Sequence, residues 1–345
     1  MRSLLFAAGD VGGARALHPI IALAAARALG PMVLRHGAMT NEVDVGARWV
    51  TREHLSFATP ETKPAAYVFA GSVADAVPLQ VARLAHAHGV PTVFVLDSWS
   101  SYAARLSTDG GPAFKPSVYC VPDEKAKADA AQEGIGAAIR VTGQPAFADI
   151  VSEAKNSPAT HGTRARILLV SEPVEADHGR NRGYTEAEVL ALVGAALKSL
   201  PSDIEVDVAP HPRDDARRIA ELWDHSRGSL AGTVLAQNTL KSVAPYDGII
   251  GMVSVLLYRG WLLGKPVLSC QPNLKLPSLR QFGDRQGLRL VEDPATATAE
   301  IEAWAATLMP GRPMVLRDEA HQHAAAADTI LDTAYRLSME STDDR

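Results

Sequence analysis

The sequence predicts an α/β protein with two similar domains. Its 345 residues exceed the roughly 100–200 residues of a typical single domain. Strand-like apolar runs alternate with helical segments through both halves, which is typical of parallel sheets. Between the halves lies one polar segment with Pro and Gly, Glu153–Arg164, which has the composition of a linker. We therefore expect an N-terminal domain at residues 1–152, a second domain at residues 165–315 and a ligand cleft between them.

The first domain is expected to begin with a buried strand, Ser3–Ala8, because this run is apolar and is followed by a glycine-rich turn and a helix, Ala14–Leu29. Further apolar runs predict strands at Met32–Arg35, Ala66–Phe69, Thr92–Leu96, Val118–Val121 and Ile139–Thr142. Helical segments between them are expected at Leu79–His88 and Glu124–Glu133.

The second domain repeats this alternation. Strands are expected at Arg166–Val170, Glu205–Val208, near Val234, and at Gly248–Ile250, Val267–Cys270 and Leu288–Val291. Helices are expected at Glu186–Leu200, Asp214–Trp223, Val255–Leu263 and Ala299–Met309. A last, Ala-rich helix, Leu316–Leu337, lies in the segment 316–345, which we expect to return to the first domain.

Composition narrows the classes of function. The net charge of −5 and the pI of about 6.1 give no basic footprint for nucleic acid. No run approaches the roughly 18–20 apolar residues of a membrane span, and Gly9–Gly13 interrupts the apolar N-terminus too early for a signal peptide. The two cysteines, Cys120 and Cys270, lie in apolar strands and are expected as buried free thiols in a reducing cytoplasm. The sequence leaves the oligomeric state open.

Two acidic residues follow expected strands of the first domain. Asp10 lies in Gly9-Asp10-Val11-Gly12-Gly13, whose glycines allow a ligand close to the backbone. The spacing is not Gly-x-Gly-x-x-Gly, so NAD is not expected. Asp97 precedes a polar and aromatic cluster in which Trp99 and Tyr102 offer faces to a pyranose. Either carboxylate can accept a proton from a sugar hydroxyl; helix capping is the alternative for both, and core packing for Trp99.

Candidate phosphate contacts follow the strands of the second domain. Ser171-Glu172-Pro173 comes after its first strand, and a polar loop with Arg180 and Arg182 follows. His211-Pro212-Arg213 ends the next strand between fixed prolines. Gly251-Met252-Val253-Ser254 leads into a helix, where free backbone N–H groups suit a phosphate. Spacings of metal-binding motifs are absent from the sequence, so no metal is expected.

Together these segments resemble those of the two-domain GT-B glycosyltransferases and UDP-N-acetylglucosamine 2-epimerases. The resemblance rests on the turn before Ser254, on His211-Pro212, on Leu263-Gly264-Lys265-Pro266 and on Thr142-Gly143-Gln144-Pro145 before the linker. It implies a GT-B-like fold of two Rossmann-like domains. The residues that it places at the donor are Ser171, Glu172, His211, Arg213, Met252, Val253, Ser254 and Arg259.

Arg259 departs from the pattern, because UDP-sugar enzymes carry there a Glu that binds the ribose. Arginine has no acceptor for those hydroxyls, which favours a CMP-linked donor or an altered ribose contact. The segment also lacks the second acid of the epimerases.

The resemblance implies a metal-independent glycosyltransferase of bacterial envelope polysaccharide biosynthesis, with a nucleotide-sugar as substrate and no cofactor. Asp97 or Asp10 would deprotonate a glycan or glycolipid hydroxyl, while His211 and Ser254 stabilise the leaving nucleotide. The protein would act in the cytoplasm, including by peripheral contact at the inner face of the membrane. A nucleotide-sugar 2-epimerase or hydrolase, and a non-catalytic nucleotide- or glycan-binding protein, are the alternatives.

Overall fold

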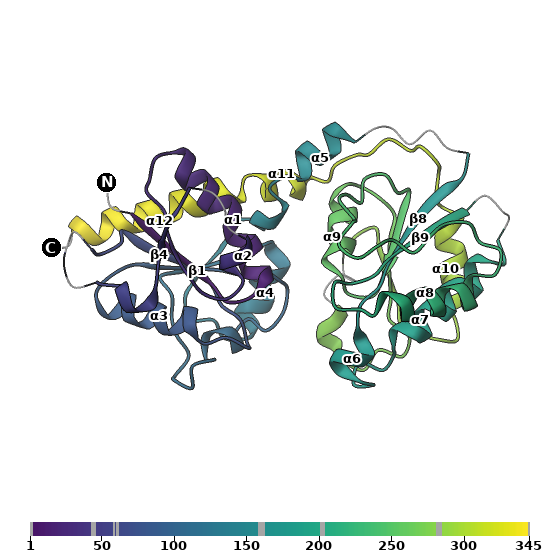
Figure 1. Ribbon diagram of the computed structural model, residues 1–345, viewed down its shortest axis with the longest axis horizontal. Coiled ribbons are helices and arrows are strands. Elements are labelled where there is room, and N and C mark those ends of the chain that lie inside the picture. The colour runs from purple at the N-terminus through teal and green to yellow at the C-terminus, as the bar shows by residue number, and fades with distance from the viewer. Residues whose placement is uncertain are drawn as a thin grey trace. The chain divides into compact units, whose positions relative to one another are not determined.

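A computed structural model of the chain describes residues 3–42, 46–57, 59, 62–157, 163–200, 204–280 and 285–343. The chain divides into two compact units (Figure 1). Unit 1 comprises Met1–Asp149 and Asp318–Arg345, and unit 2 comprises Ile150–Arg317. Each unit is an α/β layer structure with a single parallel sheet among its described residues.

Unit 1 contains a seven-stranded sheet in the order β3-β2-β1-β4-β5-β6-β7, with every described pairing parallel. The central strands are apolar and fully buried, because helices cover both faces of a parallel sheet. The strands are β1 (Leu4–Ala8), β2 (Met32–Leu34), β3 (Arg48–Val50), β4 (Ala66–Ala70), β5 (Thr92–Val95), β6 (Val118–Val121) and β7 (Ala138–Val141).

Helices α1 and α12 pack against each other and against β4, and α3 lies across the sheet from them (Figure 1). Ile330, Leu331 and Ala334 of α12 join the same buried core as Leu17 and Ile20 of α1. The C-terminal helices therefore belong to unit 1. The helices of this unit are α1 (Val11–Ala26), α2 (Met39–Glu42), α3 (Val77–Ala87), α4 (Glu124–Gln132), α11 (Asp318–Ala324) and α12 (Ala326–Asp343), with short 3-10 turns at Arg52–His54, Ala104–Leu106 and Pro145–Phe147.

Unit 2 contains a five-stranded parallel sheet in the order β12-β11-β10-β8-β9. Helices α7, α8 and α10 pack together on one face, and α9 packs on β10 and β11 (Figure 1). The strands are β8 (Ala165–Val170), β9 (Ile204–Ala209), β10 (Gly248–Gly251), β11 (Val267–Cys270) and β12 (Leu288–Val291). The helices are α5 (Ile150–Asn156), α6 (Val174–His178), α7 (Glu186–Leu197), α8 (Ala216–Arg227), α9 (Val255–Leu262) and α10 (Ala297–Ala305), with a 3-10 turn at Pro277–Arg280.

The structure differs from the sequence-based expectation in four places. Glu153–Asn156, predicted as linker, forms the end of α5, and the predicted linker residues 158–162 lie outside the described part. The short edge strand β3 was not predicted. Val234 forms an isolated bridge to Val208 rather than a strand. The single C-terminal helix is two helices, α11 and α12, divided at Ala325.

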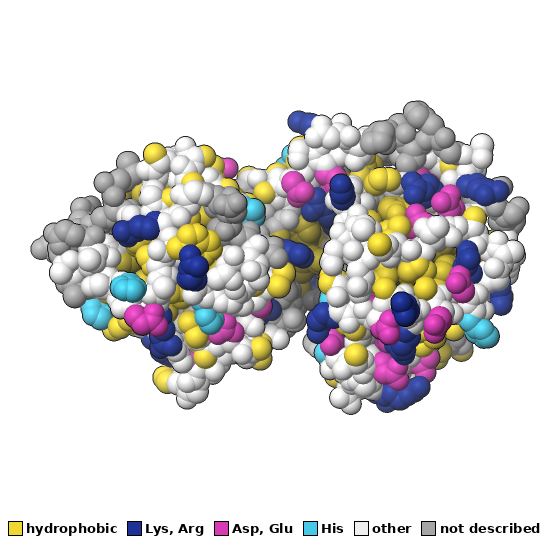
Figure 2. Space-filling model, viewed as in Figure 1, with side chains coloured by type: hydrophobic (Ala, Val, Ile, Leu, Met, Phe, Trp, Pro, Cys, Tyr) yellow, Lys and Arg dark blue, Asp and Glu magenta, His cyan; other side chains and the backbone are white. Residues whose placement is uncertain are grey.

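In each sheet the strand order reverses direction at one point, which lies between β1 and β4 in unit 1 and between β8 and β10 in unit 2. Ligands of open parallel sheets bind outside the carboxyl ends of the strands at such switch points. A ligand site is therefore expected at each of these two positions. Figure 2 shows basic and acidic side chains interspersed over the visible face, which accords with the net charge of −5.

Candidate functional site

The loop after β1 brings Asp10 and Asp97 together at the switch point of unit 1. Asp10 caps α1, with its Oδ1 accepting from the Gly13 N–H at 2.7 Å. A Cβ on Gly12 would lie 2.4 Å from Asp97 Oδ2 and 3.8 Å from Asp10 Oδ1, so both carboxylates lie against this loop. The two residues proposed from sequence thus share one place, and the capping role of Asp10 is confirmed.

Asp97 forms a buried ion pair with Arg105. Its Oδ1 accepts from Arg105 Nη1 at 2.6 Å, and the two side chains are only 8% and 10% exposed. Arg105 also donates to the Gly71 carbonyl and to Ser98 Oγ, both at 2.8 Å. Burial raises the pKa of the Asp97 carboxyl above its ordinary value, against the opposing effect of the Arg105 charge. This carboxylate neutralises a buried guanidinium, which limits its freedom to take a proton from a substrate.

The aromatic faces proposed for a pyranose are not available. Trp99 is 4% exposed and Tyr102 is 3% exposed. The Trp99 indole N–H donates to Asp123 Oδ2 at 2.7 Å, and the Tyr102 hydroxyl donates to Asp129 Oδ2 at 3.1 Å. The prediction that these rings stack on a sugar is wrong, because the carboxylates of Asp129 in α4 and of Asp123 at its N-cap satisfy their polar ends inside the unit.

The same switch point holds a His–Asp pair that the sequence did not reveal. His36, two residues beyond β2, contacts Asp75, five residues beyond β4, with 2.6 Å between Nε2 and Oδ2. The two side chains are 29% and 23% exposed. They lie 39 residues apart in the chain, and only the strand order places β2 and β4 on either side of β1.

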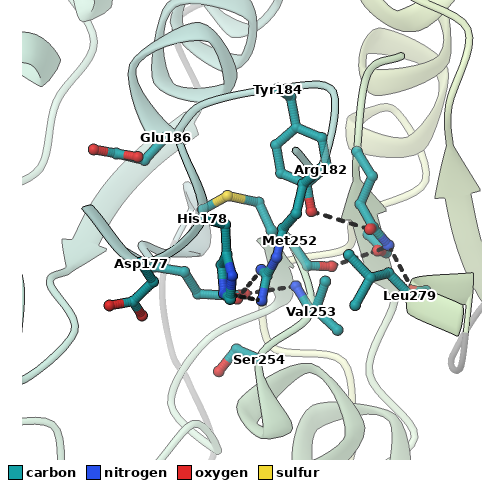
Figure 3. Close-up of polar contacts among 12 residues, drawn as sticks. Asp177, His178, Arg182, Tyr184, Glu186, Met252, Val253, Ser254 and Leu279 are labelled. Atoms are coloured by element: carbon teal, nitrogen blue, oxygen red, sulfur yellow. Dashed lines mark hydrogen bonds and ion pairs between the residues drawn. The ribbon is translucent and has the colours of Figure 1, made fainter. Parts of the chain in front are cut away.

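In unit 2 the start of α9 already binds an anion, the Glu172 carboxylate. Glu172 Oε1 accepts from the Val253 backbone N–H at 2.5 Å, and Oε2 lies 3.4 Å from Arg182 Nη1. Arg182 Nη2 donates to His178 Nε2 at 2.9 Å. Figure 3 shows Arg182, His178 and Val253 converging at this point. The N–H group predicted to be free for a phosphate is therefore occupied by a side chain of the same unit.

The Glu172 carboxylate is held there at an electrostatic cost. Burial raises the pKa of Glu172 above its ordinary value, while the N–H groups of Val253 and Ser254 and the charge of Arg182 act in the opposite direction. The His178 imidazole has a lowered pKa, through burial and the adjacent Arg182 charge. Neutral His178 accepts the Arg182 hydrogen bond, so Arg182 is the positive group closest to the carboxylate.

His211 presents one ring N–H at the end of β9. Its Nδ1 accepts from the Arg213 backbone N–H at 3.1 Å, which assigns the proton of the neutral ring to Nε2. Burial lowers the pKa of His211 below its ordinary value, so the neutral ring prevails near pH 7. Asp214 Oδ2 fixes the turn by accepting from the His211 N–H at 2.7 Å. The Arg213 guanidinium pairs with Asp177 at 2.7 Å and is 65% exposed.

The other predicted donor contacts lie around the same strand ends. Ser171 is 1% exposed, and its Oγ has no hydrogen-bond partner among the described residues. The Met252 carbonyl accepts from Ser269 Oγ at 2.5 Å. Ser254 Oγ caps its own helix by accepting from the Leu256 N–H at 3.3 Å. Their roles toward a donor remain predictions.

Arg259, predicted to lie at the ribose, is instead paired within unit 2. Its Nη2 and Nε lie 2.6 and 2.7 Å from Glu153 Oε2, and the two side chains are 14% and 7% exposed. Glu153 Oε1 accepts from Ser242 Oγ and from the Val243 N–H. Arg259 therefore ties α9 to α5, which explains why an arginine is accommodated at this position.

In the described part of the chain, no three His, Cys, Asp or Glu side chains are arranged to hold a metal ion. Of the described helices, none is both long and apolar enough to cross a membrane. Cys120 and Cys270 are free and buried, as expected.

No protein-family model matches the chain, and no curated protein matches its sequence. Solved structures match over nearly the full length. S. aureus MnaA in complex with UDP is 15% identical, covering 98% of this chain and 94% of that chain at a TM-score of 0.58. Neisseria meningitidis UDP-GlcNAc 2-epimerase bound to UDP-GlcNAc is 12% identical, covering 97% and 100% at a TM-score of 0.56. CalG4, the calicheamicin glycosyltransferase, is 12% identical, covering 100% and 97% at a TM-score of 0.55.

These likenesses bear out the architecture expected from the motifs. Two parallel sheets, each with its own switch point, correspond to the two Rossmann-like domains of that architecture. The chain therefore has the GT-B fold, which it shares with UDP-GlcNAc 2-epimerases and glycosyltransferases.

Proposed function

We propose that the chain is a nucleotide-sugar-dependent glycosyltransferase that transfers a sugar to a hydroxyl of a glycan or glycolipid acceptor without a metal ion. The observation that carries the proposal is the anion held at the start of α9, where Glu172 accepts from the Val253 N–H beside Arg182. A carboxylate at this helix start marks a position suited to a phosphate, since both anions use the same N–H groups and the same end of the helix dipole.

The donor diphosphate would bind by displacing the Glu172 carboxylate. Arg182 is 15% exposed and is the cation beside that position. His211 would donate Nε2–H of its neutral ring to the departing phosphate oxygen. Such a donor stabilises charge that develops in the transition state. Electrostatic stabilisation by Arg182, His211 and backbone N–H groups is the basis for proposing a reaction without metal.

The acceptor hydroxyl would lose its proton at the switch point of unit 1. Both proposed carboxylates, Asp10 and Asp97, lie there beside Gly12. The oxygen would then attack C1 of the donor sugar as the bond from C1 to the phosphate oxygen breaks. We place this reaction in bacterial envelope polysaccharide synthesis on the cytoplasmic side, with peripheral membrane contact.

A non-catalytic nucleotide- or glycan-binding protein is the second candidate, and Glu172 is the observation that favours it. A carboxylate fixed on the Val253 N–H would keep a diphosphate out. An epimerase or hydrolase remains the third reading, since the fold is shared with 2-epimerases. In this chain Arg259 stands where the family pattern has a Glu, and its charge is neutralised by Glu153.

The test begins with thermal shifts of the full chain in UDP, CMP, GDP, dTDP and ADP, because a ligand that binds the native state raises its apparent stability. The matching nucleotide-sugar is then incubated with and without p-nitrophenyl glycosides and with EDTA, and products are identified by mass spectrometry. Transfer that survives EDTA supports the proposal. Epimerised sugar or free nucleotide alone supports the third reading, and binding without turnover supports the second.

A further inference from the structure

The buried side chain of Gln271 joins three segments of unit 2 at the carboxyl ends of its strands. Gln271 comes directly after β11 and is 1% exposed. Its Oε1 accepts from the Tyr184 hydroxyl at 3.0 Å. Its Nε2 donates to Ser269 Oγ and to the Leu279 carbonyl, both at 3.0 Å. One amide therefore connects the loop before α7, the end of β11 and the 3-10 turn that follows it.

Only one orientation of this amide satisfies its partners. Ser269 Oγ gives its proton to the Met252 carbonyl at 2.5 Å, so it must accept from the amide. The Leu279 carbonyl can only accept, so Nε2 faces both of these groups and Oε1 faces the Tyr184 hydroxyl. The hydrogen bonds thus run in one direction from Tyr184 through Gln271 and Ser269 to Met252. Tyr184 and Met252, the two ends of this chain of hydrogen bonds, are labelled in Figure 3.

The end at Met252 controls a backbone N–H at the start of α9. The Met252 carbonyl and the Val253 N–H belong to one planar peptide unit, in which they point in opposite directions. Ser269 Oγ holds the carbonyl from one side, and Glu172 Oε1 accepts from the N–H on the other at 2.5 Å. A hydrogen bond to the carbonyl fixes the plane of the peptide and strengthens the N–H as a donor. The direction in which the Val253 N–H points therefore depends on Ser269.

The end at Tyr184 holds the loop that carries Arg182. The Arg182 carbonyl accepts from the Lys275 N–H at 2.9 Å, and the Gly183 carbonyl accepts from Asn273 Nδ2 at 3.2 Å. This loop is therefore docked on the segment that follows β11. The two groups at the anion position, a backbone N–H and the Arg182 guanidinium, are thus linked to each other through one buried amide.

We propose that Gln271 is a positioning residue for the phosphate of the nucleotide. Through Ser269 it directs the Val253 N–H towards the phosphate, and through Tyr184 it fixes the loop of Arg182. The inference rests on the proposed nucleotide-sugar-dependent function and involves groups of unit 2 alone. A network that only stabilised the fold would lower the free energy of unfolding when it is cut, but it would leave the nucleotide affinity of the folded chain unchanged.

The test uses whichever of UDP, CMP, GDP, dTDP and ADP raises the thermal stability of the full chain. Isothermal titration calorimetry gives the Kd of this nucleotide, and urea titration gives the free energy of unfolding. Gln271→Met removes all three hydrogen bonds of the amide, whereas Ser269→Ala removes the bond to the Met252 carbonyl and keeps the amide. Tyr246→Phe is the matched control, because it also removes a buried hydrogen bond of unit 2, to Asp207 Oδ2 at 3.1 Å, but before β10 rather than after it.

Each variant is measured with Glu172 present and with Glu172→Ala. When Glu172 is present, its carboxylate and the phosphate compete for the same N–H, so misdirecting the N–H weakens both and Kd should change by about twofold or less. With Glu172→Ala only the phosphate uses the N–H, and we expect Gln271→Met and Ser269→Ala to raise Kd by about tenfold. This is the lower end of the contribution of one hydrogen bond to a charged acceptor. Tyr246→Phe should leave Kd within about twofold in both backgrounds.

Three outcomes would overturn the proposal. Values of Kd for Gln271→Met and Ser269→Ala equal to that of Tyr246→Phe in the Glu172→Ala background would make the network purely structural and leave the proposed function intact. An equal rise of Kd in both backgrounds would show that Gln271 acts on something other than the Val253 N–H. A wild-type chain that binds none of the five nucleotides would remove the proposed function and the role of Gln271 with it. Ser269→Ala decides by the same comparisons if Gln271→Met does not fold.

Discussion

Replacing Glu172 by glutamine tests whether the start of α9 is a phosphate site held by its own carboxylate. Glutamine keeps the length of the side chain and an oxygen that can accept from Val253, but removes the charge. We expect Glu172→Gln to bind the matching nucleoside diphosphate about tenfold more tightly than the wild-type chain, because the phosphate no longer competes with an anion for the same N–H group.

The magnitude follows from the contact between Val253 N and Glu172 Oε1, which is 2.5 Å long. A hydrogen bond to a charged acceptor contributes about 1.5–3 kcal/mol, against about 0.5–1.5 kcal/mol for a neutral one. The difference of about 1–1.5 kcal/mol corresponds to about five- to twelvefold in affinity. If the carboxylate stayed within about 4 Å of the phosphate, repulsion of about 4 kcal/mol per unit charge would enlarge the effect.

Isothermal titration calorimetry with the nucleotide measures the effect directly. Glu175→Gln is the control, because Glu175 lies on the neighbouring helix α6, is paired with Arg218 and is half exposed. Removing that screened charge should change the affinity by no more than about twofold. A Glu172→Gln affinity equal to or below that of the wild type would refute the reasoning, since Glu172 would then contact the ligand or the ligand would bind elsewhere.

Three further changes test other parts of the two units. Asp97→Asn should lower the free energy of unfolding, measured by urea titration, by about 3–5 kcal/mol, because it leaves Arg105 buried and charged. The double variant Asp97→Asn with Arg105→Met should regain most of the lost free energy of unfolding. If the losses of the two single variants simply added in the double variant, the ion pair would not be the cause. Lys265 is 7% exposed, and burial lowers its pKa from 10.5 to about 8. Above pH 8 the unfolded chain therefore binds more protons than the folded chain. Between pH 8 and 10.5 the free energy of unfolding of the wild type should rise by up to about 3 kcal/mol relative to that of Lys265→Met. Parallel curves of unfolding free energy against pH for the two proteins would contradict this prediction. His211→Ala should reduce turnover by about 10²-fold or more with the fold retained by circular dichroism, and an active variant would make His211 structural.

The sequence was sufficient to place most candidate groups because parallel strands end at one edge of a sheet. Asp10 and Asp97 each follow an apolar strand of unit 1, and Glu172 and Val253 each follow one of unit 2. The location of each pair at the edge of its own sheet could therefore be predicted without knowing the strand order. The resemblance to the GT-B architecture used the same strand ends. Local patterns and their positions after strands were therefore informative about the fold and the place of the site.

The partners of these groups could not be predicted because they come from distant segments. Glu172 and Val253 are 81 residues apart, and Arg259 and Glu153 are 106 residues apart. His36 follows a three-residue strand and shows no motif by itself. The only indication of the pair in the sequence is that a polar residue follows each of the two strands that neighbour β1, and those neighbours can be identified only from the strand order. Whether a polar side chain at a strand end can act on a substrate depends on the charged partner it contacts, and these partners come from distant segments of the chain.

The pH dependence of nucleotide binding follows from the same contact and separates a displaceable carboxylate from a permanent one. Burial raises the pKa of Glu172, so protonation of the folded chain begins at a higher pH than for an ordinary glutamate. As pH falls through that raised pKa, the wild-type affinity should approach that of Glu172→Gln. His178 and the nucleotide phosphate also gain protons, but they do so equally in both proteins, so the ratio of the two affinities isolates Glu172.

The same raised pKa makes the stability of the free protein depend on pH. The folded state binds the Glu172 proton more tightly than the unfolded state does, so the stability that Glu172 contributes falls as pH rises. The thermal stability of Glu172→Gln should therefore exceed that of the wild type more at neutral than at acid pH, measured without nucleotide. If the ratio of the two nucleotide affinities stayed constant with pH, the Glu172 carboxylate would not compete with the phosphate.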